Sequence, residues 1–486
     1  MTLTSPPDDR ATRLPDEDRL ASLARRARAA LAYLGEPPAN WVPPREGADL
    51  DVAIIGGGQS GTALAFALHR AGIRNLAVYD RAPRGREGVW RDVARMRNLR
   101  SSKLLPGPEQ GIAELTFQAW YEAAFGEQAY ADLLRSPREV WADYVGWFRE
   151  TVGIAVENGT SLTGIVPVEA GLRLELATPA GARSVVARKL VLATGMSGMG
   201  RPMIPAALSG LPGTLWAHTD DPIDFAALKG ARIGVLGAAS SAFDAAATAL
   251  EAGAGSASLF SRHSDLVRIT TIKGMAYPGV LDHFHELPDA DRWSLLNYFS
   301  RRSAGPMPDT VERATRFANF SLHLAADWRE VRERDGGVEV LAGGRRHGFD
   351  FVIVGTGYEA DLAARPELAA LAPHAALWRD RFEPPPGERN DWLGAFPYLG
   401  AGFELIERVP GRAPFLRDVH LFNFGGMVSH GRAVGEIASL KHGVPRLVSQ
   451  IGRDLFLADR TAHLARLVSY ATPDLTGAEY AAAIAR

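Results

Sequence analysis

The chain has 486 residues, 46% of them hydrophobic, which is enough for large cores and for two or three domains of roughly 100 to 200 residues. Lysine and arginine number 54 against 56 for aspartate and glutamate, so no overall basic field indicates nucleic acid or an anionic membrane as a partner. Cysteine is absent, which excludes disulfides, thiolate metal sites and cysteine-based redox chemistry.

The first residues predict no targeting segment. Met1 to Arg10 contains two prolines and two aspartates where a secretion signal needs a basic start and an apolar run. No stretch approaches the roughly 18 apolar residues of a membrane span. We therefore expect a cytoplasmic protein with a small-molecule substrate, no nucleic-acid or membrane partner, and homo-oligomer formation left open.

Residues 1–48 predict an N-terminal helical arm. Apolar residues recur there at three- and four-residue spacing, which is typical of an amphipathic helix on a domain surface: Leu20, Leu23, Ala27, Leu31 and Leu34. Four prolines between residues 37 and 44 then end the helix.

A first nucleotide-binding fold opens at residue 51. The apolar strand 51–55 runs into Gly56-Gly-Gly58-Gln-Ser-Gly61, and residues 62–71 have the pattern of a helix. The first glycine permits the turn, the second lets the backbone approach a pyrophosphate, and the third lets helix and strand pack closely. Asp80 ends the next strand, where an acid would bind a ribose hydroxyl. The motif predicts a bound dinucleotide.

A second opening of this kind begins at residue 231. The strand 231–236 leads into the loop 237–242 and an alanine-rich helix over 243–252, but Ala239 and Ala242 replace the second and third glycines. A methyl group at Ala239 is expected to hold a pyrophosphate slightly further off. Arg262 follows the next strand and suits the 2′-phosphate of NADPH; the alternative is a solvated surface arginine.

From Leu50 to Gly431 the motifs resemble those of the class B flavin monooxygenases, which include flavin-containing, Baeyer–Villiger and N-hydroxylating enzymes. The segments that carry the resemblance, besides the first glycine loop, are Glu87-Gly-Val-Trp90, Leu99-Arg-Ser-Ser-Lys103, Ala193-Thr-Gly195, Arg201-Pro-Met-Ile-Pro205 and Gly355-Thr-Gly-Tyr358. Leu211-Pro-Gly213 with His218 is similar to the linker signature Phe-x-Gly-x-x-x-His, with one extra residue and with Pro222 at a usually aromatic position. Disulfide reductases share the paired folds but need a cysteine pair, which is absent here.

The resemblance implies an α/β protein with two Rossmann-like domains and helical additions. We expect the FAD domain at residues 49–205 and 346–470, and the NADPH domain at 206–345 with a helical insertion at about 281–326. The residues expected to bind these cofactors are Gly56, Gly58, Gln59, Ser60, Gly61, Asp80, Arg81, Trp90, Ser102, Thr194, Gly195, Gly237, Ser240, Ser241, Arg262, Gly357 and Gly425.

The resemblance also implies the reaction: NADPH reduces FAD, O2 adds to form a C4a-peroxide, and one oxygen atom enters a small organic substrate. Arg100 is a candidate catalytic residue because a guanidinium would favour the peroxide anion, which attacks carbonyls; this indicates Baeyer–Villiger oxidation. Structural pairing with an acid such as Asp92 is the alternative role for Arg100. N- or S-oxygenation, and a flavin protein without oxygen transfer, are the alternative functions.

Three further groups have two interpretations each. His218 is a candidate for ordering the linker between the domains, or an ordinary loop histidine. The sequence Asp282-His-Phe-His285-Glu286 suggests a metal site, but the family needs no metal, so we expect none; the alternative is that these residues line the substrate pocket. The aromatic group Trp120, Tyr121, Trp141, Tyr144 and Trp147 favours core packing over a substrate box, because helical spacing runs through it.

Overall fold

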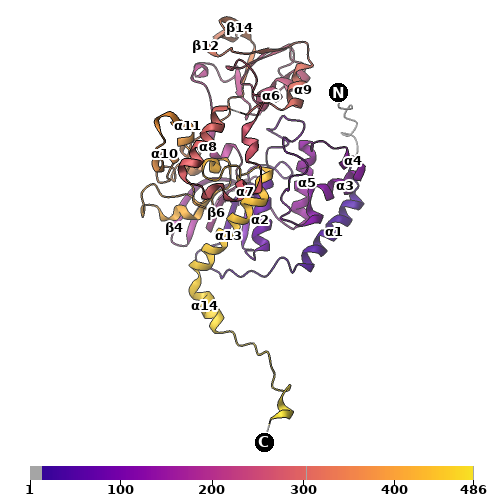
Figure 1. The fold of residues 1–486 in the computed structure, drawn as a ribbon, viewed down its shortest axis with the longest axis vertical. Helices are drawn as coiled ribbons and strands as arrows, with labels where there is room; N and C mark the ends of the chain where they lie inside the picture. The colour runs from indigo at the N-terminus through magenta and orange to yellow at the C-terminus, as the bar shows by residue number, and fades with distance from the viewer. Residues whose placement is uncertain (1–13, 303, 485–486) are drawn as a thin grey trace.

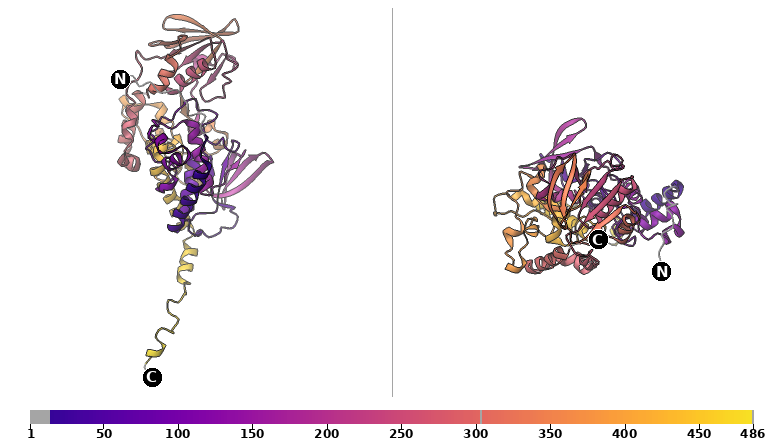
Figure 2. Two further views of the ribbon diagram at one scale, coloured as in Figure 1. Left: turned by 90° about the vertical axis from the view of Figure 1, so that its right-hand side faces the viewer. Right: turned by 90° about the horizontal axis from the view of Figure 1, so that it is seen from above.

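The computed structural model describes residues 14–302 and 304–484. Two α/β units are stacked along the long axis, and a helical C-terminal arm leaves the opposite end of the molecule (Figures 1 and 2). The predicted α/β class with two Rossmann-like units is confirmed. Across the described residues, no helix combines the length and the apolar character needed to cross a bilayer.

The first unit is built on a sheet of seven strands. Five are parallel, in the order β3 (Glu157–Asn158), β2 (Leu76–Asp80), β1 (Leu50–Ile55), β6 (Gly181–Leu192) and β17 (Val419–Leu421). The strands β4 (Ser161–Val168) and β5 (Gly171–Thr178) add an antiparallel meander to β6. Val52, Ala53 and Ile54 are fully buried, as expected for a central parallel strand with both faces covered. The C-terminal ends of β1, β2 and β6 therefore lie side by side.

The second unit has a fully parallel sheet in the order β11 (Phe320–His323), β10 (Ser256–Phe260), β9 (Arg232–Leu236), β15 (Phe351–Val354) and β8 (Trp216–His218). An antiparallel meander covers it: β12 (Trp328–Arg334), β13 (Gly337–Ala342) and β14 (Arg345–Phe349). The expected boundary at residue 346 was therefore wrong. The strands β14 and β15 bury Phe349, Val352 and Val354 in the core of the second unit, so the chain returns to the first unit only after Val354.

Two of the crossovers between the units pair with each other. Residues 200–202 form β7 (Gly200–Pro202) on the way out, and residues 358–360 form β16 (Tyr358–Ala360) on the way back. The two strands are antiparallel, with Arg201 opposite Glu359. A two-stranded ribbon is thus a covalent connection between the sheets.

Helices cover the first unit on several sides. Helix α2 (Gln59–Arg70) follows β1, and α3 (Phe117–Phe125), α4 (Glu127–Ala131) and α5 (Arg138–Thr151) carry a buried aromatic core that includes Trp120, Trp141 and Tyr144. The N-terminal helix α1 (Glu17–Tyr33) packs on α3 and buries four of the five predicted apolar positions. Leu34 is the exception, since it lies beyond the helix end and is 59% exposed.

The expected helical insertion divides between the two units. Helices α7 (Pro278–His283) and α8 (Asp289–Arg302) pack on the first unit beside α12 (Met427–His430) and α13 (Leu440–Ala458), whereas α9 (Pro308–Thr315) packs on α6 (Ser240–Glu251) of the second. Phe284 and Trp293 belong to the core of the first unit, which explains the division. The remaining helices are α10 (Trp378–Arg381), α11 (Asp391–Gly394) and α14 (Arg460–Val468).

Candidate active site

The first glycine loop has the backbone that a dinucleotide requires. Gly56 takes a φ of +108°, and a Cβ there would lie 2.4 Å from the carbonyl oxygen of Ala193. Gly58 caps α2, and a Cβ on Gly61 would lie 1.8 Å from the Gly56 oxygen. Only glycine allows these close approaches, and the resulting turn directs the N-terminus of α2, with Gln59 and Ser60 in its first turn, as a pyrophosphate site requires.

Asp80 fixes this loop. Its carboxylate accepts hydrogen bonds from the backbone N–H groups of Gly57 and Ala82, both at 2.7 Å, and the residue is buried. A carboxylate has four lone-pair sites, so the two bonds leave capacity for the ribose hydroxyl expected here. Arg81, the next residue, is exposed to solvent.

A buried ion pair beneath the loop was missed by the sequence reading. Arg149 of α5 lies 3.1 Å from the Glu87 carboxylate and donates a hydrogen bond of 3.2 Å to the Gly57 carbonyl. Both side chains are almost fully buried. Glu87 begins the motif that contains Trp90, and the Trp90 indole lies 3.5 Å from where a Cβ on Gly88 would be. Only the pattern around Glu87 was visible in sequence, because Arg149 comes from a distant helix.

The late segment of the chain closes the first site. Asn423 is fully buried; its amide donates to the Thr194 hydroxyl (3.0 Å) and its oxygen accepts from the Gly425 N–H (2.9 Å). Gln59 donates to the Gly435 carbonyl (3.1 Å). The predicted residues Gln59, Thr194 and Gly425 are therefore brought together. Gly195, beside Thr194, has a φ of +68°.

The second loop keeps the same backbone in spite of its alanines. Ala239 caps α6 with φ −85° and ψ 174°, close to the −69° and −166° of Gly58, a conformation that any residue adopts without strain. Gly237 has a φ of +115°. A Cβ on Gly355 would lie 2.8 Å from the Ala242 methyl, so a glycine on the neighbouring strand compensates for the lost third glycine. The loop therefore fits a dinucleotide.

The predicted polar residues of the second loop lie in two environments. Ser240 is buried and its hydroxyl accepts from the Met307 N–H at 3.2 Å, whereas Ser241 is exposed. Arg262 follows β10 and is exposed. Among the described residues, Arg262 has no ion pair or hydrogen bond within its own chain, so its guanidinium is available to a ligand.

His218 lies at the junction of the two units. It ends β8, is buried, and its Nδ1 accepts from the Asp220 N–H at 3.1 Å. Tyr358, on the returning crossover, donates to the Asp220 carboxylate at 2.7 Å and packs against the imidazole. Burial lowers the pKa of His218 below its usual value, so the ring is neutral at pH 7. Gly357 completes the junction, since its carbonyl accepts from Met203 N–H at 2.9 Å.

Arg100 bridges the units. Its guanidinium lies 3.4 Å from Asp244, a buried residue of α6 that also lies 3.4 Å from Arg313 of α9. Asp92, the partner suggested by the sequence, pairs with Arg86 instead. Ser102, in the same segment as Arg100, is exposed, and its hydroxyl accepts from the Leu104 N–H at 3.2 Å.

A hollow of about 840 Å³ lies between the late segment and the second loop. We call it the α7–α8 hollow; it is lined by residues from Ile269 to Leu287 and by Leu295, Tyr298 and Phe299 of α8. On one side, Met275 and Phe284 would contact a Cβ on Gly431 at 2.9 and 3.0 Å. Its volume is in the range of small-molecule sites.

The other side of the α7–α8 hollow approaches the second loop. The Thr270 hydroxyl accepts from the Gly305 N–H at 3.0 Å, and Met307, two residues on, bonds Ser240 at the start of α6. Thr271 contributes a buried hydroxyl with no hydrogen-bond partner in the described chain. From the sequence, only residues 282–286 were considered as pocket lining; the rest of this wall was missed because it is assembled from short helices of no recognisable motif.

A histidine–arginine cluster supports the wall of this hollow. Arg446 of α13 donates to Nδ1 of His285 (2.7 Å) and to Nδ1 of His430 (3.1 Å). Burial and the Arg446 charge lower the pKa of His285 to about 4, and burial lowers the pKa of Arg446 to about 10. Asp282 bonds His442 at 2.8 Å. Within residues 14–302 and 304–484, no three potential metal ligands gather as a site.

The comparisons with known proteins agree with two dinucleotide sites. A family model described as FAD-NAD(P)-binding matches residues 53–197. The FAD-dependent urate hydroxylase of Xanthomonas campestris pv. campestris is 41% identical over 453 residues, which cover 92% of this chain and 94% of that protein.

Two solved structures share the fold. The ornithine hydroxylase of Pseudomonas aeruginosa superposes with a TM-score of 0.65 at 17% identity, covering 84% of this chain and 99% of that one. The L-lysine 6-monooxygenase of Pseudomonas syringae gives a TM-score of 0.59 at 21% identity, covering 83% and 99%.

The fold, the two glycine loops and the relatives together define a flavoprotein with binding sites for two dinucleotides. The chain belongs to the family of the FAD-dependent urate hydroxylase, and it shares the fold of the ornithine hydroxylase and the L-lysine 6-monooxygenase. It is a flavoprotein monooxygenase that binds FAD and an NAD(P) cofactor, in agreement with the assignment made from the motifs.

Proposed function

We propose that this monooxygenase hydroxylates a small, planar nitrogen heterocycle of the urate type. The observation that carries the proposal is the 41% identity to the urate hydroxylase, which extends over 92% of the chain and so covers both loops and the α7–α8 hollow. The homologues with solved structures hydroxylate ornithine and lysine, but identities of 17% and 21% support the fold alone.

The α7–α8 hollow is the proposed substrate site. It borders Gly431 on the side of the first loop and Thr270 on the side of the second, so a molecule in it would lie between the two cofactor sites. Tyr298 and Phe299 offer flat aromatic surface, and the unpartnered Thr271 hydroxyl in the wall is available for a hydrogen bond to a polar ring edge. Aromatic walls with few polar groups are typical of sites for planar ligands.

The residues described above have distinct proposed roles in the reaction. The first loop, Asp80 and Thr194 would hold FAD, and the second loop with Arg262 would hold NADPH. When bound, FAD supplies the redox chemistry that takes a hydride from NADPH and activates O2. His218 and Tyr358 set the angle between the units, and the wall around Phe284 excludes water from the reacting atoms.

The Baeyer–Villiger prediction depended on Arg100 as a cation beside the reacting oxygen. The ion pair with Asp244 offsets part of the Arg100 charge, which weakens the reason for preferring carbonyl substrates. We therefore place hydroxylation of a heterocycle first. Baeyer–Villiger oxidation, like N- or S-oxygenation of amines or thioethers, is the outcome to be tested beside it.

The test is a substrate panel on the FAD-loaded enzyme: urate, xanthine, ornithine, lysine and a cyclic ketone. We expect urate-type compounds to accelerate NADPH oxidation, with one oxygen atom from O2 recovered in the product by isotope labelling. The matched variants Phe299→Ala and Phe125→Ala separate the hollow from general aromatic loss, because only Phe299 lines it. Turnover of the ketone alone, or an unchanged KM in Phe299→Ala, would overturn the proposal.

A further inference from the structure

The C-terminal arm, which we define as residues 460–484, has an apolar face that its own chain does not cover. In α14, Leu464, Leu467 and Val468 are spaced by three and one residues, so they share one face, and they are 58%, 68% and 88% exposed. His463 is the one buried residue of this helix. A nine-residue helix is too short to be stable alone in water, so this face needs a partner surface.

An ion pair at the start of α14 directs the arm away from the first unit. Asp459, the N-cap residue of α14, accepts a hydrogen bond of 2.7 Å from Arg188, and both side chains are largely buried. From this anchor α14 extends beyond the sheet and helices of the first unit (Figures 1 and 2). Within the arm, His463 packs against Trp41 and Phe456 of its own chain, whereas the face that carries Leu464, Leu467 and Val468 stays exposed.

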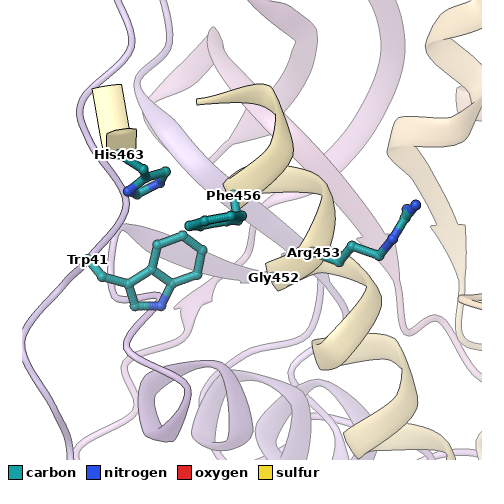
Figure 3. Close-up of a pocket in the computed structure, with 5 residues that line it drawn as sticks. All are labelled: Trp41, Gly452, Arg453, Phe456 and His463. Atoms are coloured by element: carbon teal, nitrogen blue, oxygen red, sulfur yellow. The ribbon is translucent and has the colours of Figure 1, made fainter. Parts of the chain in front are cut away.

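A hollow suited to such a face lies beside the root. It measures about 450 Å³ and is lined by Trp41, Gly452, Arg453, Phe456 and His463 (Figure 3). The Phe456 and His463 rings stack at 4.7 Å, and Trp41 lies 5.6 Å from His463. Phe456 is 45% exposed, so the hollow presents aromatic surface to an incoming side chain.

We propose that the arm of one copy docks on this aromatic hollow of a second copy, forming a homodimer. Arm and hollow lie at the same end of the molecule, so a two-fold axis there would make the contact twice, each arm covering the other copy's hollow. Closed pairing of this kind buries both apolar surfaces at once.

The charge of the arm favours a second copy over a membrane. Within residues 460–484, Arg460 and Arg466 are balanced by Asp474 and Glu479, and Arg486 is the only further charged side chain, so two arms repel little and no basic cluster attracts anionic lipid. Tyr470, Leu475 and Tyr480 extend the exposed apolar surface past the helix, at 71%, 60% and 50% exposure. A longer apolar segment strengthens a protein contact without adding charge.

The test is the mass of the full chain in solution by sedimentation velocity at micromolar concentration. We expect a dimer for the parent chain, and a dissociation constant raised at least about tenfold in Leu464→Glu/Leu467→Glu. Leu14→Glu is the control, because Leu14 is also exposed, at 86%, but lies outside arm and hollow. Flavin content and NADPH oxidation serve as folding checks and are expected to stay unchanged.

The hollow is tested separately at Gly452, which lies on α13 and has room for a side chain. Gly452→Glu places a charge in the aromatic hollow and is expected to weaken the dimer, whereas Gly452→Ala leaves it intact. A monomeric parent chain, with or without binding to phosphatidylcholine vesicles, overturns the proposal. So does a dimer that survives both the arm and the hollow variants.

Discussion

Arg100 of the first unit and Asp244 of the second face each other at 3.4 Å across the junction between the units. Asp244 is buried, and burial raises its pKa above the usual value, while Arg100 and Arg313 counter that rise. Arg97 adds a parallel bridge to Glu251 at 2.9 Å. These contacts hold the second unit against the segment of the first unit that contains Arg97 and Arg100.

If this pair positions the units, removing either half weakens the contact between them, and removing Asp244 also breaks its pairing with Arg313. We expect Arg100→Ala and Asp244→Asn each to slow the reduction of bound FAD by NADPH, by roughly threefold, because Arg100 is partly exposed. Anaerobic stopped-flow absorbance measures this rate. The direct role at the reacting oxygen would instead appear as extra hydrogen peroxide released per NADPH in Arg100→Ala alone.

Asn423 is expected to govern how firmly FAD is held. Asn423→Ala removes the hydrogen bonds to Thr194 and Gly425 and should raise the FAD dissociation constant by about tenfold, through the loss of two buried bonds. Flavin fluorescence on dilution measures the release. Asn319→Ala is the control, since Asn319 also makes two hydrogen bonds, to the Ala254 and Gly255 carbonyls, but is exposed and lies in the second unit. Equal FAD loss in both variants would contradict the assignment.

Arg262 should determine the preference for NADPH over NADH. Arg262→Gln removes the cation proposed for the 2′-phosphate, so KM for NADPH is expected to rise about tenfold while KM for NADH stays constant. Steady-state NADPH and NADH oxidation give both values. Arg268→Gln is the control, because Arg268 is also exposed but pairs with Asp265. A proportional rise for both cofactors would mean that Arg262 does not contact the phosphate.

His285 should make the protein less stable as pH falls. The pKa of His285 is about 4 when folded and near 6.5 when unfolded, so the unfolded chain binds the extra proton between these values. His285 therefore does not lower the free energy of unfolding above about pH 6.5, and it lowers it progressively as the pH falls toward 4. In His285→Gln, which keeps an acceptor for Arg446, we expect a smaller fall in the melting temperature over this window. An identical pH profile would show that the ring is protonated in the folded state.

The local parts of the site could be predicted from sequence. Gly56, Gly61 and Gly237 are specified by the backbone geometry of a strand–loop–helix unit, and such a unit is contiguous in the chain. The same holds for α1, where a short apolar repeat predicted the buried face. Asp80 was found for its position, although its contacts to the loop backbone were not predicted.

Sequence alone determined the class of this protein: two dinucleotide loops in one cysteine-free chain, in the order typical of class B monooxygenases. Tertiary structure decided which distant residues complete the loops. Arg149 under Gly57, Asn423 beside Thr194 and Gly355 against Ala242 are separated by tens to hundreds of residues from their partners. Their pairing depends on strand order and helix packing, which bring side chains together in space without leaving a periodic or contiguous pattern in the chain.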